Sequence, residues 1–250
     1  MNLFAETWAW LMDPARWSGP TGIPVAIAQH LGFTFLSVLI AAAVAIPAGW
    51  AIGHTGKGRE VAVAISGAAR AIPSFGLLVL LVLVMGVLQT QAAAVITFVL
   101  LGIPSILAGA YAGFEAIDRR VIDAGRAMGM TEWQILWRIE VPLGLPLLVS
   151  GLRAATLQIV ATVTIAGYVG LGGLGLFIIQ GINLNRFDQV LAGAILVAAL
   201  ALLLDALFAL TERLVVPRGV LAGRAGGAGP ARAKRGGRAA RTTSVQPSAA

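Results

Sequence analysis

Few residues in this sequence have the side-chain chemistry of a catalytic or metal site. There is no cysteine and there are only two histidines, His30 and His54, so neither a thiolate nucleophile nor a histidine-based metal site is indicated. Three ionisable residues, Arg70, Arg153 and Asp205, lie within long apolar stretches, where a charge is expected to face water or a partner. We expect either a polar lining of a path across a membrane or an ion pair of Asp205 with one arginine. The ion pair is favoured because bare arginines would repel a cationic solute.

Two glycine-rich runs match nucleotide-binding motifs but lack the surroundings of those motifs. Residues 170–175 read G-x-G-x-x-G, yet no strand precedes them, so they do not indicate a dinucleotide site. Residues 53–58 are similar to a phosphate loop, but Ala51 replaces its first glycine and Gly58 its magnesium ligand. We therefore expect no ATP hydrolysis and no bound cofactor in this chain. The glycines expected instead to let helices pack closely and line a cavity are Gly170, Gly172, Gly173 and Gly175.

The composition is that of a membrane protein. Hydrophobic residues make up 58% of the 250 and charged residues only 12%, about half the charged share of a soluble domain, so a soluble enzyme is excluded. A helix needs about 20 apolar residues to cross a bilayer core of about 30 Å. We expect an all-α polytopic bundle of about five transmembrane helices, five to six at most. The five stretches of sufficient length are 30–52, 61–85, 92–114, 145–168 and 189–210.

Two local features modify this picture of straight spans. Pro73 removes a helical hydrogen bond and predicts a kink in the second span, which would make a gate element of Arg70, Pro73, Ser74 and Phe75.

Residues 1–24 lack the basic and apolar regions of a cleavable signal peptide. They predict instead a short helix at the membrane interface, where aromatic residues accumulate. The residues that would lie at the interface are Phe4, Trp8, Trp10, Leu11, Met12 and Trp17.

The net charge of +7 comes from one end of the chain. From Arg213 onward there are eight basic residues and no acid, which leaves a nearly neutral body. Residues 216–250 predict a disordered basic tail. They contain no aromatic residue that could stack on bases, so nucleic-acid binding is not favoured. Because cytoplasmic loops carry the excess of Lys and Arg, we expect a multi-pass protein of the cell membrane with its N-terminus outside and its C-terminus in the cytoplasm.

Residues 115–141, between the third and fourth spans, are longer than a connector needs to be. Their pattern predicts two short helices separated by a glycine bend at residues 129–131, with Thr131 capping the second helix. Pro142 and Pro146 would then end that helix and begin the fourth span. Such a helical pair at the cytoplasmic surface is suited to the groove of a partner protein.

This segment resembles the signature of binding-protein-dependent ABC importer permeases. The family pattern is E-A-A, three residues, G, nine residues, I, one residue, L-P; here Asp123-Ala124-Gly125, Gly129, Ile139 and Val141-Pro142 stand at the same spacing. Three positions depart from it conservatively. The resemblance implies that the segment docks into an ATPase subunit that binds ATP and magnesium. The residues implied to transmit this coupling are Asp123, Ala124, Gly125, Met128, Gly129, Met130, Thr131, Ile139 and Pro142.

Two further runs narrow the resemblance, which covers about residues 25–215. Residues 71–78 are similar to the IPS-x-x-LL run of osmoprotectant permeases, and residues 169–175 to a run shared with methionine importers. The resemblance implies the type I importer permease fold and import of a glycine betaine, choline, carnitine or proline type of solute. The implied partners are an ATPase dimer, a second permease, which is a paralogue or the same chain, and an extracytoplasmic binding protein. A methionine or other small-solute importer and an ATP-independent carrier remain as alternatives.

Overall fold

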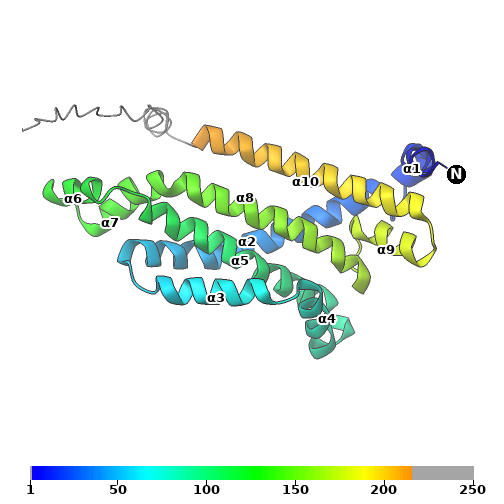
Figure 1. Ribbon diagram of the computed structural model, residues 1–250, viewed down its shortest axis with the longest axis horizontal. Coiled ribbons are helices and arrows are strands. Elements are labelled where there is room, and N and C mark those ends of the chain that lie inside the picture. The colour runs from blue at the N-terminus through cyan, green and yellow to red at the C-terminus, as the bar shows by residue number, and fades with distance from the viewer. Residues whose placement is uncertain (1, 216–250) are drawn as a thin grey trace, which may run out of the picture. The chain divides into compact units, whose positions relative to one another are not determined.

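Helices make up all of the regular secondary structure in the described part of the chain (Figure 1). The structure, a computed structural model, describes residues 2–215; the tail expected over residues 216–250 lies outside them. Four helices carry most of the bundle: α2 (Ile23–Thr55), α5 (Thr90–Glu115), α8 (Val141–Ala166) and α10 (Phe187–Val215). Their length and apolar composition alone identify them as candidate membrane spans. The predicted all-α membrane bundle is confirmed.

Helix α5 lies at the centre of the bundle, packed between α2 and α8. Its glycines set the distance to α8, since a Cβ on Gly109 would lie 2.6 Å from the carbonyl oxygen of Leu147, and one on Gly113 would lie 2.7 Å from that of Gly144. Gly109 and Gly113 form a G-x-x-x-G pair on one face of α5. Small residues at this spacing let two backbones approach in a membrane, where packing rather than water drives association.

The second predicted span is broken into two helices, α3 (Arg59–Ala71) and α4 (Ser74–Met85), bent by 84°. The kink expected at Pro73 is present, and it is a sharp break between two helices. Pro73 has no N–H to donate and holds Ile72 in an extended conformation, which ends α3. At 1.5 Å per residue, α3 alone is about 20 Å long and too short to cross. The described residues hold four candidate spans, or five if the bent pair is one span.

Two short helices protrude at one end of the bundle (Figure 1): α6 (Arg119–Ala127) and α7 (Glu132–Ile135). The prediction that Pro142 ends the second of these is wrong, because the helix continues from α7 through a π-helical turn, Leu136–Glu140, into α8. In that turn the Val141 N–H donates to the Leu136 carbonyl, five residues back. The wider turn accommodates the proline ring directly after it, where a regular α-turn would bring a clash.

The opposite end of the bundle carries the N-terminal segment and α9 (Gly175–Asn183). Helix α1 (Leu3–Met12) packs against α10, and a 3-10 turn, Pro14–Trp17, leads from it toward α2. Trp10 of α1 is buried and meets Phe177 edge-on at 5.4 Å, whereas Phe4 and Trp8 are exposed. One face of α1 thus belongs to the core, and the other presents aromatic rings outward, as an interfacial helix does. Two further 3-10 turns, Val87–Gln89 and Gly167–Val169, flank α4 and α8.

Candidate functional site

The bend between α6 and α7 is built by one glycine. Gly129 has φ +81°, a conformation that side-chain-bearing residues rarely adopt. Its N–H donates to the Arg126 carbonyl at 2.9 Å, and the Met130 N–H donates to the Gly125 carbonyl at 3.2 Å. These two bonds form a Schellman motif, which terminates α6 and turns the chain. The predicted glycine bend is confirmed.

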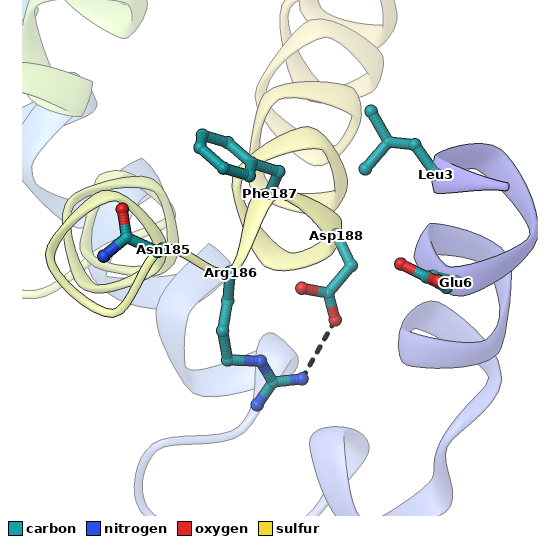
Figure 2. A pocket seen from close by; sticks show the side chains of 6 residues that line it. All are labelled: Leu3, Glu6, Asn185, Arg186, Phe187 and Asp188. Atoms are coloured by element: carbon teal, nitrogen blue, oxygen red, sulfur yellow. Dashed lines mark hydrogen bonds and ion pairs between the residues drawn. The ribbon is translucent and has the colours of Figure 1, made fainter. Parts of the chain in front are cut away.

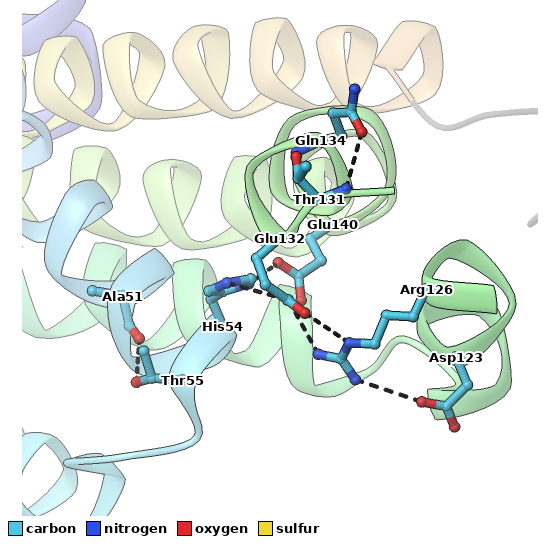
Figure 3. Close-up of polar contacts among 9 residues, drawn as sticks. All are labelled: Ala51, His54, Thr55, Asp123, Arg126, Thr131, Glu132, Gln134 and Glu140. Atoms are coloured by element: carbon cyan, nitrogen blue, oxygen red, sulfur yellow. Dashed lines mark hydrogen bonds and ion pairs between the residues drawn. The ribbon is translucent and has the colours of Figure 1, made fainter. Parts of the chain in front are cut away.

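Helix α7 begins at a capping box, as the sequence predicts for Thr131. The Thr131 hydroxyl accepts from the Gln134 backbone N–H at 3.3 Å, and the Gln134 side-chain oxygen accepts from the Thr131 N–H at 3.0 Å (Figure 3). The reciprocal bonds satisfy two backbone donors that an uncapped helix leaves free. Both ends of the bend are thereby fixed by local hydrogen bonds.

The spacing of Gly125 and Ile139 has a packing origin. A Cβ on Gly125 would lie 3.0 Å from the Ile139 Cδ1 and 3.6 Å from the Ile135 Cγ1, so α6 rests directly on the start of the helix that becomes α8. Ile122, one turn earlier, is buried on the same face, whereas Val121 and Met128 are exposed. Only a small residue fits at position 125. The motif therefore encodes a fixed angle between α6 and the membrane helix.

An ion pair joins α6 to α7 across the bend. The Arg126 guanidinium donates to both carboxylate oxygens of Glu132, at 2.8 and 3.1 Å, and lies 3.5 Å from Asp123 (Figure 3). The hydrogen bond with Glu132 is the main reason that the pKa of Arg126 is raised above its usual value. Bidentate geometry restricts the relative rotation of the two short helices.

A second polar contact ties this end of the molecule to α2. His54, in the last turn of α2, has its Nδ1 2.5 Å from the Glu140 Oε2, and its Nε2 lies 3.8 Å from the Glu132 Oε2 (Figure 3). The Glu140 side chain is only 8% exposed, so this contact supplies the partner that a buried carboxylate needs. The sequence pattern predicts a contact for neither His54 nor Glu140. One signal was present: Glu140 is an acid placed directly before the apolar start of the fourth span.

The exposed side of α6 and α7 carries apolar side chains. Ala124, Met128 and Gly129 lie on the surface, and Met128 is 75% exposed. Trp133 is also mostly exposed and packs edge-on against Trp137. We name residues 116–140 the coupling segment. It is a rigid, partly apolar projection whose buried side is anchored to the bundle.

The residues expected to form a gate lie at the end of α3 that is farther from the coupling segment. Arg70, Pro73, Ser74 and Phe75 occupy the elbow between α3 and α4. Phe75 packs edge-on against Tyr168 at 5.0 Å, which brings the elbow beside the glycine-rich run at 170–175. The structure therefore places these two candidate regions next to each other, although nearly 100 residues separate them in sequence.

The glycine-rich run forms a tight connection over the start of α2. Gly170, Gly172 and Gly173 all have φ between +73° and +80°, and the Gly173 N–H donates to the Gln29 side-chain oxygen at 3.0 Å. A Cβ on Gly175 would collide with the Thr164 carbonyl. A cleft of about 170 Å³ lies between this run and α2. Backbone conformation thus favours glycine at positions 170, 172 and 173, and close backbone packing requires it at position 175.

The ion pair expected of Asp205 forms with Arg153, in the middle of α8 and α10. Arg153 Nε and Nη2 donate to the two Asp205 carboxylate oxygens, each at 2.7 Å, and Glu212 lies 3.6 Å from Arg153. Arg70 has no ion pair among the described residues and lies on α3, which does not pack against α10. The structure therefore does not bring the three ionisable residues of the spans together.

A larger hollow of about 490 Å³ lies where α1 meets the turn into α10 (Figure 2). Arg186 and Asp188 form an ion pair at 2.9 Å on one side of it, and Leu3 and Glu6 of α1 face them (Figure 2). A hydrogen bond connects α1 to α10 beside the hollow, because the Thr7 hydroxyl donates to the Asp188 carbonyl at 3.4 Å. This hollow is at the end of the bundle opposite the coupling segment.

Comparison with known proteins defines the class. Residues 45–217 match the family model of the binding-protein-dependent transport system inner membrane component. The chain belongs to this family and is a permease subunit of an ABC importer, a multi-pass inner membrane protein.

Named relatives are transport permeases. The carnitine transport permease protein OpuCB of Listeria monocytogenes is 33% identical over 80% of this chain and 90% of its own length. The glycine betaine/carnitine/choline permease OpuCB of Bacillus subtilis is 30% identical over 77% and 88%. The osmoprotectant import permease OsmY of Salmonella typhimurium is 32% identical over 77% and 81%.

Solved structures support the fold. A chain of the inward-facing MetNI methionine ABC transporter superposes with a TM-score of 0.70, covering 82% of this chain and 99% of that one, at 24% identity. At this identity the likeness concerns the fold alone. The predicted type I importer permease fold is confirmed.

Proposed function

We propose that this permease carries a compatible solute of the glycine betaine, carnitine, choline or proline type into the cell. The observation that carries the proposal is the similarity of the chain, along at least three quarters of its length, to permeases named for these solutes. The low number of aromatic residues inside the spans supports a path of low affinity, with most of the selectivity in a separate binding protein.

The coupling segment is proposed to receive the ATPase. Its exposed side chains surround the Gly129 bend, and its buried side is fixed to α2 and α8 through the His54–Glu140 contact. A projection anchored in this way transmits a push from a partner to the membrane helices instead of absorbing it. ATP and magnesium would bind to the partner, and alternating access would follow from rocking of two permeases.

The membrane orientation is proposed from charge. Basic residues at the coupling end, including Lys57, Arg119 and Arg120, favour a cytoplasmic position, which puts α1 and the α9–α10 turn outside. A binding protein would then deliver solute at the end that carries the hollow near Arg186.

Two experiments test these statements. The gene is deleted from its source strain, and uptake of labelled glycine betaine, carnitine, choline, proline and methionine is measured at high osmolarity. Loss of uptake of any of the first four solutes supports the proposal, and loss of methionine uptake alone contradicts it.

The second experiment tests the membrane orientation. Since the chain has no cysteine, Met128→Cys and Asn185→Cys each give one reactive thiol. An impermeant maleimide added to whole cells should label only the Asn185→Cys variant.

A further inference from the structure

A cleft of about 220 Å³ opens between α3 and α5. Helix α3 contributes Val63, Ser66, Gly67 and Arg70, and α5 contributes Ala108 and Tyr111. The volume is below the range of about 300–1,000 Å³ typical of pockets for drug-sized ligands, so it is suited to a smaller solute. The cleft combines one cation, one hydroxyl and one phenol ring on largely apolar walls.

Arg70 is the unusual member of this lining. It is exposed and has no ion pair among residues 2–212, whereas the other two ionisable residues within the apolar stretches, Arg153 and Asp205, are paired. At 1.5 Å per residue it lies about 16 Å along α3 from Arg59, well inside the apolar stretch of residues 61–85. An unpaired guanidinium is costly in lipid at that depth. The cleft therefore borders water or a polar ligand, not acyl chains.

The helix geometry gathers the polar groups of the cleft on one side. Ser66 and Gly67 lie one turn before Arg70, and a long side chain on a helix leans toward the N-terminal turn. A Cβ added to Gly67 would meet no atom within 4 Å, so the space over this turn is open. Because Arg59 pairs with Glu115 at 3.3 Å, α3 and α5 run antiparallel from that end, and Tyr111 lies closer to it than Arg70 does. A cation and an aromatic ring are thus offset along the same cleft.

We propose that this cleft binds zwitterions that carry both a carboxylate and a quaternary ammonium group, and so adds a weaker selection in the permease to that of the binding protein. The inference rests on the proposed import of compatible solutes. Arg70 would pair with the carboxylate, Ser66 would donate a hydrogen bond to it, and the Tyr111 ring would face the ammonium group. Choline lacks the carboxylate, and its cation is repelled by Arg70. The permease therefore prefers carnitine or glycine betaine to choline.

The test replaces the chromosomal gene with variants, so that the complete importer is assayed with its own partners. We expect Arg70→Gln to lower uptake of labelled carnitine and glycine betaine by about tenfold or more, the scale of one lost charge-assisted hydrogen bond. Choline uptake, where the parent shows it, should stay within about twofold or rise. Arg70→Lys should recover part of the zwitterion uptake, because the charge is restored without the planar fork. Tyr111→Leu should lower it about threefold and Tyr111→Phe should not.

The matched control is Arg59→Gln, which removes an arginine from the same helix outside the cleft and should leave the ratio of zwitterion to choline uptake unchanged. Immunoblots of membranes establish equal amounts of each variant. Equal losses of zwitterion and choline uptake in Arg70→Gln would assign Arg70 to folding or assembly and overturn the inference, as would unchanged zwitterion uptake. A parent strain that imports choline but no zwitterion also overturns it. Failure of the parent to import any of these solutes contradicts the proposed function instead, before any variant is examined.

Discussion

The Nδ1 of His54 lies 2.5 Å from the Oε2 of Glu140, and this contact joins the end of α2 to the π-helical turn that leads into α8. The two residues are 86 positions apart in sequence. Since Gly125 of α6 packs on Ile139 of this turn, the contact links the coupling segment to α2 as well as to α8.

Loss of this contact is expected to weaken both stability and coupling. In His54→Ala the buried Glu140 carboxylate loses its closest polar partner, at a cost of about 1–3 kcal/mol. We expect a lower midpoint of thermal unfolding in detergent and less solute uptake per ATP hydrolysed. Thr55→Ala is the control, because Thr55 is exposed and its hydroxyl bonds only to nearby backbone, donating to the Ala51 carbonyl (Figure 3) and accepting from the Lys57 N–H. Equal behaviour of the two variants would show that the contact has no role.

The bend at Gly129 gives a second prediction. A Cβ there would meet no neighbour within 4 Å, but φ +81° strains any side-chain-bearing residue by roughly 1–2 kcal/mol. Gly129→Arg adds a bulky cation to the exposed surface besides this strain. We expect normal membrane insertion with loss of ATPase co-purification and of uptake. Retention of both would remove the coupling segment as the docking site.

The packing of Gly125 predicts a graded series. An added Cβ would lie 3.0 Å from the flexible Ile139 Cδ1, so Gly125→Ala requires a shift of only a few tenths of an ångström. Gly125→Leu would separate α6 from the turn before α8. We expect the alanine variant to keep at least half of the parental uptake and the leucine variant to lose most of it. The order is checked by uptake at equal membrane levels, and a reversed order contradicts the packing argument.

Variants of Arg153 and Asp205 can separate the two interpretations of this pair, a structural ion pair and a polar lining of the path. Removal of one partner, as in Asp205→Leu, leaves Arg153 with only Glu212, at 3.6 Å, and should lower the amount of protein in the membrane. The double variant Arg153→Met with Asp205→Leu removes both charges and should restore the protein level. Restored uptake in the double variant identifies a structural pair. Restored protein without uptake identifies a polar lining of the path.

Much of this protein is determined by the sequence alone. Runs of about 20 apolar residues predict membrane helices because a bilayer leaves the backbone few other ways to satisfy its hydrogen bonds. The bend at Gly129 and the cap at Thr131 are equally local, since both depend on hydrogen bonds within six residues. The spacing of Gly125 and Ile139 has another origin, the packing of α6 on the start of α8, but it can be read from the sequence as part of the pattern that resembles the family signature.

Tertiary structure decided what depends on residues far apart in the chain. Composition cannot distinguish a straight span from the 84° elbow at Pro73, because α3 and α4 together hold enough apolar residues for one span. It also cannot pair His54 with Glu140, or choose Arg153 rather than Arg70 for Asp205. These outcomes follow from the packing of α5 between α2 and α8, where glycines bring helices to contact distance and so determine which side chains meet.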